Sequence, residues 1–120
     1  NSFKDYCLKM NYLVSNSISD NKTAIKKALN FSSTDIIFDT LLYYRDILNI
    51  DITPHKLTLS EIIKNNEPYK ISQLDISGSD ITALGYDGKQ VGEKLQFLLD
   101  EAIKNPNLNS RKKLLNLICN

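Results

Sequence analysis

All four glycines of this 120-residue chain lie within fifteen positions, at Gly78, Gly85, Gly88 and Gly92. Glycine reaches left-handed backbone conformations, or lets another backbone approach closely, without a steric penalty. The rest of the sequence is rich in apolar residues at helical spacing. The clustering therefore indicates special backbone geometry at one place, and we look for the function there.

The composition is that of a soluble globular protein, with 42% hydrophobic and 24% charged residues. No apolar run approaches the roughly 18 residues that span a bilayer. Because the chain starts with neither Met nor a signal peptide, we interpret it as beginning inside a longer protein, whose active site can lie elsewhere. Cys7 and Cys119 lack metal-ligand spacing, so a buried free thiol at Cys7 is favoured over a disulfide, which points to a cytoplasmic location.

The apolar periodicity predicts an all-α fold, a compact bundle of about six to seven helices with a glycine-rich helix-turn-helix near the C-terminal half. We divide it into a body-like helical subdomain, 1–66, and a tail-like subdomain carrying the glycine turn, 67–120. The third helix is apolar on most sides and is expected to be central. The fourth should bury Leu57, Ile62 and Ile63. The helices expected in 1–66 cover 3–14, a segment after a cap at Ser19 or Asp20, 36–48 after a cap at Ser32 or Ser33, and a segment from a Thr53-Pro54 cap to about Asn65.

In 67–120 the segment 69–76 is open between a helical turn and an extended connector. The elements expected after it are a short helix 80–84 capped by Ser79 and closed by Gly85, a long helix from Gly88 to about Asn105, and a last helix capped by Asn109 or Ser110.

Catalytic chemistry has little support. The single histidine, His55, has no Cys, Ser or acidic partner nearby in the sequence, so we expect a surface or capping role. No group of residues has metal-ligand spacing, and Asp35 and Asp39 are typical of a solvated helix face. Residues 85–90 resemble a P-loop, but Ala83 stands where the first glycine belongs and Gln90 where Ser or Thr would bind magnesium.

Two other look-alikes fail as well. The Gly78-Ser79 pair followed by Asp87 is similar to a nucleotidyltransferase active site, but Lys89 replaces the second acid. Gly85 to Gly88 has the GXXG spacing of a KH loop without the surrounding βααβ pattern.

The turn before the long helix favours anion binding, because backbone N–H groups and the positive helix end point outward there, beside Lys89. From 89 to 113 there are six basic residues against three acidic ones. The alternative is a plain helical hairpin, in which Gly85 ends one helix and Gly92 permits close packing.

The segment LDISGSDITALGYDGKQVGEKLQFLLDEAIKNPNLNSRKKLL resembles the C-terminal region of bacterial class II CCA-adding tRNA nucleotidyltransferases, in the poly(A)-polymerase-like family. The likeness is specific over about 69–115, with Ile81 for Leu and Asn105-Pro106 for a glycine as mild departures. The matching positions are Leu74, Ile76, Gly78, Asp80, Ile81, Gly85, Gly88, Lys89, Val91, Gly92, Leu95, Leu98, Leu99, Ile103, Asn109, Leu114 and Leu115.

In that family a catalytic head uses magnesium with CTP or ATP, a neck selects the nucleotide, and helical body and tail regions hold the tRNA. Nothing here matches the head or the nucleotide-selecting motif. The resemblance therefore implies a fragment without catalytic residues or cofactors, whose partners are the tRNA acceptor and T arm and the parent's head and neck, with a homodimer also open. A protein-interaction or dimerisation module without RNA contact is the alternative.

Contacts with the sugar-phosphate backbone of the tRNA would fix its position on the protein without recognising its base sequence. The residues that we expect to contact RNA are Gly85, Gly88, Lys89, Lys94, Arg111, Lys112 and Lys113, and those expected to shape the turn are Gly78, Asp80 and Gly92. If Gly88 takes a positive φ, Gly88→Val should damage both folding and binding.

Overall fold

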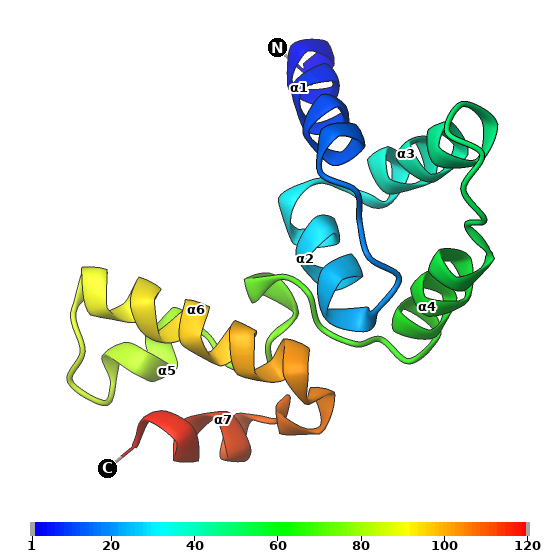
Figure 1. The fold of residues 1–120 in the computed structure, drawn as a ribbon. Coiled ribbons are helices and arrows are strands. Elements are labelled where there is room, and N and C mark those ends of the chain that lie inside the picture. The colour runs from blue at the N-terminus through cyan, green and yellow to red at the C-terminus, as the bar shows by residue number, and fades with distance from the viewer. Residues whose placement is uncertain (1, 120) are drawn as a thin grey trace. The chain divides into compact units, whose positions relative to one another are not determined.

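The computed structural model describes residues 2–119, and every secondary-structure element among them is a helix, which confirms the predicted all-α class (Figure 1). The described residues form seven α-helices and two short 3₁₀ helices joined by turns and loops, and they include no strand. None of the helices between residues 2 and 119 combines the length and the apolar character needed to cross a membrane. The chain forms two compact units, Asn1–Asn66 (unit 1) and Glu67–Asn120 (unit 2).

Unit 1 is built from two helix pairings, α1 with α3 and α2 with α4. Its helices are α1 (Ser2–Ser15), α2 (Lys22–Phe31), α3 (Thr34–Asp46) and α4 (Thr53–Lys64).

Side-chain caps start two of these helices. Ser33 accepts a hydrogen bond from the Ile36 N–H at the start of α3, as one of the two predicted caps. The cap of α2 is Asn21, whose Oδ1 lies 2.8 Å from the Ala24 nitrogen, and not Ser19 or Asp20. Helix α4 already begins at Thr53, so Thr53 is not its cap.

Helix α3 buries one face and exposes another, so the prediction of a helix buried on most sides is wrong. Ile37 and Tyr44 are fully buried, whereas Phe38 and Leu42 keep 44% and 42% of their surface. Helix α3 packs against α1 and α2, and its buried residues repeat at the three- and four-residue spacing of one helix face.

Helix α4 also differs from expectation. It buries Leu59 and Ile62, whereas Leu57 and Ile63 are exposed at 65% and 48%. Of the three predicted residues, Ile62 is confirmed, whereas Leu57 and Ile63 are wrong because the packed face of α4 includes Leu59 in their place.

Three side chains from α3 and α4 hold the loop 16–20. The buried Tyr44 hydroxyl accepts a hydrogen bond from the Ile18 N–H at 3.0 Å and donates to the Leu13 carbonyl. His55 Nε2 donates to the Ile18 carbonyl at 2.8 Å, and Thr58 Oγ1 donates to the Asp20 carbonyl at 2.7 Å.

The surface or capping role expected for His55 is therefore wrong, because the side chain is only 8% exposed and its ring lies edge-on to Tyr44. It satisfies the carbonyl of a buried loop residue, which would otherwise lose its hydrogen bond to water. The partner is 37 residues away, so local sequence carries no sign of it. The two cysteines are free thiols, with Cys7 half-buried instead of buried.

Unit 2 contains η1 (Ile71–Gln73), α5 (Gly78–Thr82), α6 (Gly88–Lys104), η2 (Pro106–Leu108) and α7 (Arg111–Ile118). Ser110 caps α7, as one of the two predicted residues, whereas α5 is capped by Ser77 instead of Ser79. The open segment 69–76 contains the short helix η1 followed by extended backbone at Leu74.

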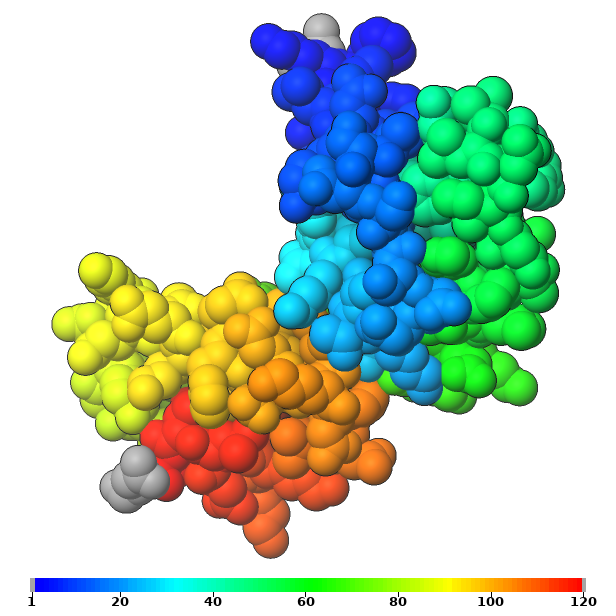
Figure 2. Space-filling model, viewed as in Figure 1, coloured from blue at the N-terminus to red at the C-terminus, as the bar shows by residue number. Residues whose placement is uncertain are grey.

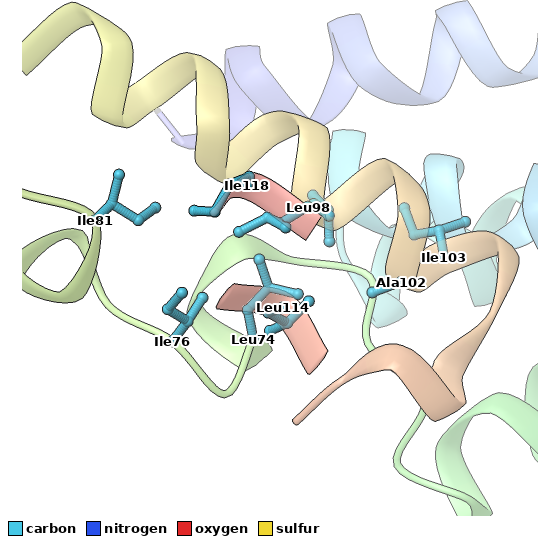
Figure 3. Close-up of a cluster of buried hydrophobic side chains, with 9 residues drawn as sticks. Leu74, Ile76, Ile81, Leu98, Ala102, Ile103, Leu114 and Ile118 are labelled. Carbon is cyan, nitrogen blue, oxygen red and sulfur yellow. The ribbon is translucent and has the colours of Figure 1, made fainter. Parts of the chain in front are cut away.

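The core of unit 2 lies between α6, α7, α5 and the connector before α5 (Figure 3). Leu74 and Ile76 of the connector point to the same interior, on either side of the exposed Asp75. This period of two belongs to extended chain. The buried residues of this core are Leu74, Ile76, Ile81, Leu98, Leu99, Ala102, Ile103, Leu114 and Ile118.

Candidate anion-binding turn

Gly85 closes the helix α5 in a left-handed conformation with φ +101°. Its N–H lies 2.9 Å from the Thr82 carbonyl, so the glycine both ends the helix and reverses the chain. Among the described glycines only Gly85 has a positive φ. The condition set for Gly88, that it adopts such a φ, is therefore not met.

The remaining glycines differ in their surroundings. A Cβ at Gly78 would lie 3.4 Å from Val91 Cγ1, an ordinary van der Waals contact between α5 and α6. A Cβ at Gly88 or Gly92 would meet no atom within 4 Å. The packing role suggested for Gly92 is therefore wrong, because a side chain would find open space at Gly92, as it would at Gly88.

The N-terminus of the 17-residue helix α6 follows this turn at the surface of unit 2 (Figure 2). Gln90 Oε1 accepts a hydrogen bond from the Asp87 N–H at 3.2 Å, so the residue that excludes a P-loop serves as part of a cap. The N–H groups of Gly88 and Lys89 have no acceptor within the helix. With the helix dipole and the exposed Lys89 side chain, they favour an anion at this position.

Asp80 braces the start of α5. Its Oδ2 accepts hydrogen bonds from the Ser77 N–H at 2.9 Å and the Ser77 hydroxyl at 3.1 Å, and its Oδ1 lies 2.8 Å from Arg111 Nη2. The Ser77 N–H, and after it the Ser77 hydroxyl and the guanidinium of Arg111, hold the pKa of Asp80 below its ordinary value. Asp80 is an ionised structural residue.

A second set of hydrogen bonds joins the connector to the start of α7. Asn109 Oδ1 accepts from the Asp75 N–H at 2.8 Å, and Asn109 Nδ2 donates to the Gln73 carbonyl at 3.0 Å. Asp75 Oδ2 accepts from the Arg111 N–H at 3.2 Å. We call these bonds, together with the Asp80–Arg111 ion pair, the connector clasp. The sequence indicates a turn or capping role for Asp75, but not its bond to Arg111 or the part of Gln73. The alternation of Leu74 and Ile76 around Asp75 is the signal of extended chain at this point.

The cationic residues expected to contact RNA have different surroundings. Lys94 Nζ lies 5.0 Å from the centre of the Tyr86 ring, a cation–π contact. Lys113 Nζ donates to the Asn107 carbonyl at 3.0 Å, and Arg111 is paired with Asp80. Lys89 and Lys112 are exposed, and within residues 2–119 neither side chain makes an ion pair or a hydrogen bond.

Lys89 and Lys94 do not lie in one row along α6. Lys89 and Lys94 are five residues apart on α6, which separates them by about 140° around the helix axis. Unit 2 as a whole carries seven Lys and Arg residues against seven Asp and Glu residues. Attraction of a polyanion therefore has to be local, and the start of α6 with Lys89 is the place where backbone and side chain act together.

Comparisons of the sequence with models of protein families, of the chain with curated proteins, and of its fold with solved structures find no match.

Proposed function

We propose that this chain is the tRNA-holding C-terminal part of a CCA-adding tRNA nucleotidyltransferase. It grips the backbone of the acceptor and T arm while a separate head domain adds nucleotides to the 3′ end. The observation that carries the proposal is the exposed start of α6, where Gly85 turns the chain and Lys89 stands beside unpaired N–H groups. This turn falls inside the 69–115 segment that resembles such enzymes.

The chemistry suits an enzyme that has to accept every tRNA. Backbone N–H groups and Lys89 bind phosphate oxygens, which set the position of a duplex without reading its bases. An A-form helix is recognised through shape, phosphates and 2′-hydroxyls. Magnesium and CTP or ATP belong to the head in this proposal, and the cytoplasm is the compartment where tRNA is matured.

The surroundings of the cations rank their contributions. Lys89 and Lys112 can reach a phosphate without breaking an existing contact. Arg111 has to exchange the Asp80 carboxylate for a phosphate. Lys94 either gives up its contact with the Tyr86 ring to bind a phosphate, or binds the phosphate while it stays over the ring. We therefore expect Lys89 to contribute most to binding.

A second function, a protein-interaction or dimerisation module, is favoured by the exposed apolar surface of unit 1. Phe3, Leu8 and Leu57 keep 74%, 61% and 65% of their surface. Ten of the fourteen large apolar side chains that are exposed in the described chain lie in unit 1, and four, such as Phe97, lie in unit 2. Where exposed apolar side chains adjoin one another, they form the contiguous patches that mark partner surfaces.

The test is the affinity of the 120-residue chain for a tRNA minihelix and for a random-sequence RNA duplex, each at two salt concentrations. Salt-sensitive binding that favours the minihelix, and that Lys89→Glu weakens, supports the proposal. Lys104→Glu is the control, since it makes the same charge change at the other end of α6, about 22 Å away at 1.5 Å per residue. It also breaks the exposed ion pair of Lys104 with Glu101, which contributes little to stability.

Absence of binding at low salt by a folded chain contradicts the proposal. An equal loss of RNA affinity in both variants contradicts a specific role for the start of α6, because the loss would then follow from the change in net charge alone. Concentration-dependent mass in sedimentation, without RNA binding, would favour the interaction module.

A further inference from the structure

A groove of about 470 Å³ lies in unit 1, between the C-terminal half of α1, the loop 16–20 and α2. This volume falls in the range of roughly 300–1,000 Å³ that is typical of ligand sites. Its walls include Tyr12, Phe31, Lys27, Asn16 and Ser19. The turn of unit 2 has no part in it.

Two aromatic rings form the apolar wall. The centres of the Tyr12 and Phe31 rings lie 5.0 Å apart with an angle of 51° between the planes, and the two side chains keep 54% and 43% of their surface. The rings therefore support each other while leaving part of their faces open. Exposed aromatic faces are the surfaces on which unpaired bases stack.

The groove also carries one charged residue. Lys27 is the only charged lining residue, it is exposed, and within residues 2–119 it has no acidic partner. Asn16 and Ser19 add polar groups to the same wall as the loop. The lining is therefore complementary to a ligand with a flat ring, hydrogen-bonding groups at the ring edge and a negative charge at one end.

The loop wall is held in place before any ligand arrives. Its backbone accepts hydrogen bonds from His55 and Thr58 and donates one to Tyr44, side chains that come from α3 and α4. Two of these three, Tyr44 and His55, are buried. A wall fixed by other helices keeps the groove open at low entropic cost on binding.

We infer that this groove binds one unpaired nucleotide of an RNA strand, with the base against Tyr12 and Phe31 and a neighbouring phosphate at Lys27. The inference rests on the proposed function, to which it adds a second, single-stranded contact. An apolar side chain of a protein partner would cover the rings but leave Lys27 and the polar loop without a counterpart. A nucleotide matches all three features.

The experiment compares three RNAs on the full chain: a blunt duplex, the same duplex with a four-nucleotide single-stranded tail, and the tail alone. The tail should tighten duplex binding about fivefold or more, by the stacking of one base. Tyr12→Ala and Lys27→Ala should each abolish this gain and leave blunt-duplex binding unchanged. Phe38→Ala, a comparably exposed ring outside the groove lining, and Lys56→Ala, an exposed lysine on α4, are the matched controls.

The outcomes separate the two proposals. If the blunt duplex binds but the tail adds nothing, or its gain survives both groove variants, the groove inference is wrong and the duplex proposal stands. If the tail alone binds in a Tyr12-dependent way and the duplex does not, the groove inference stands and the duplex proposal fails. If no RNA binds, both fail. Lys27→Ala changes an exposed side chain, so it tests the groove even if Tyr12→Ala does not fold.

Discussion

Arg111 Nη2 lies 2.8 Å from Asp80 Oδ1, an ion pair between residues 31 positions apart in the chain. It connects the first residue of α7 to the first turn of α5, as part of the connector clasp. An exposed pair of this kind contributes little to stability. Its consequence is for binding, since a phosphate at Arg111 has to compete with a carboxylate already in contact with the guanidinium.

The first prediction follows from this competition. Asp80→Asn should tighten binding of the RNA duplex and steepen its salt dependence by about one ion, because Arg111 becomes available to phosphate. Combining it with Arg111→Ala should cancel the gain, as measured by salt titration. Asp100→Asn, which removes an equal charge elsewhere in unit 2, is the control. If Asp100→Asn tightened RNA binding equally, the effect of Asp80→Asn would come from net charge, and the competition at Arg111 would be contradicted.

Acid should weaken the protein through Asp80. Because its folded pKa is lowered, its stabilising contribution is fully present above the ordinary value of 3.8 and is lost as the pH falls through the lower folded pKa. Urea unfolding between pH 6 and pH 2.5 measures this. Asp46 and Asp51 also have lowered pKa values, so the readout is the difference between wild type and Asp80→Asn, which should shrink at the acid end. A constant difference would contradict the assignment.

Two glycines should respond in opposite directions to the same substitution. Gly85→Ala forces a Cβ into a left-handed conformation and should lower the free energy of unfolding by about 1–2 kcal/mol. Gly92→Ala, in the interior of α6 with open space around it, should raise that free energy by about 0.5–1 kcal/mol. Urea unfolding of both variants is the measurement, and a loss of stability in Gly92→Ala would mean that its surroundings are not open.

A further prediction concerns the hydrogen bonds by which Tyr44 holds the loop 16–20 of unit 1. Tyr44→Phe removes the hydroxyl that pairs with the Ile18 N–H and the Leu13 carbonyl, and it should cost about 2 kcal/mol because buried backbone groups lose their partner. Tyr43→Phe is the control, since the Tyr43 hydroxyl makes no hydrogen bond within the described residues. Thermal unfolding distinguishes them. An equal loss of stability in the two variants would contradict the role of the Tyr44 hydroxyl in holding the loop.

Much of the helical pattern could be read from local sequence. The long helix after Gly88 follows from apolar residues at Leu95, Leu98 and Ala102, because the period of 3.6 residues is a property of neighbouring positions. The turn at Gly85 follows from the absence of a Cβ, which makes a positive φ cheap. Even there, the cap of α5 was placed two residues late, since Ser77 and Ser79 are equally good caps until Asp80 selects one of them.

By itself, therefore, the sequence determined an all-helical chain, the place of its left-handed glycine turn and the inward residues of its long helix, all of which depend on spacing within about one or two turns. Only the tertiary structure decided that His55 is buried against Ile18, that α3 exposes Phe38, and that Arg111 pairs with Asp80. Those outcomes depend on which elements meet. Which elements meet is set by contacts between residues 31 to 37 positions apart, and by how many apolar helix faces a small unit can bury. Neither can be recognised from the residues next to each position in the chain.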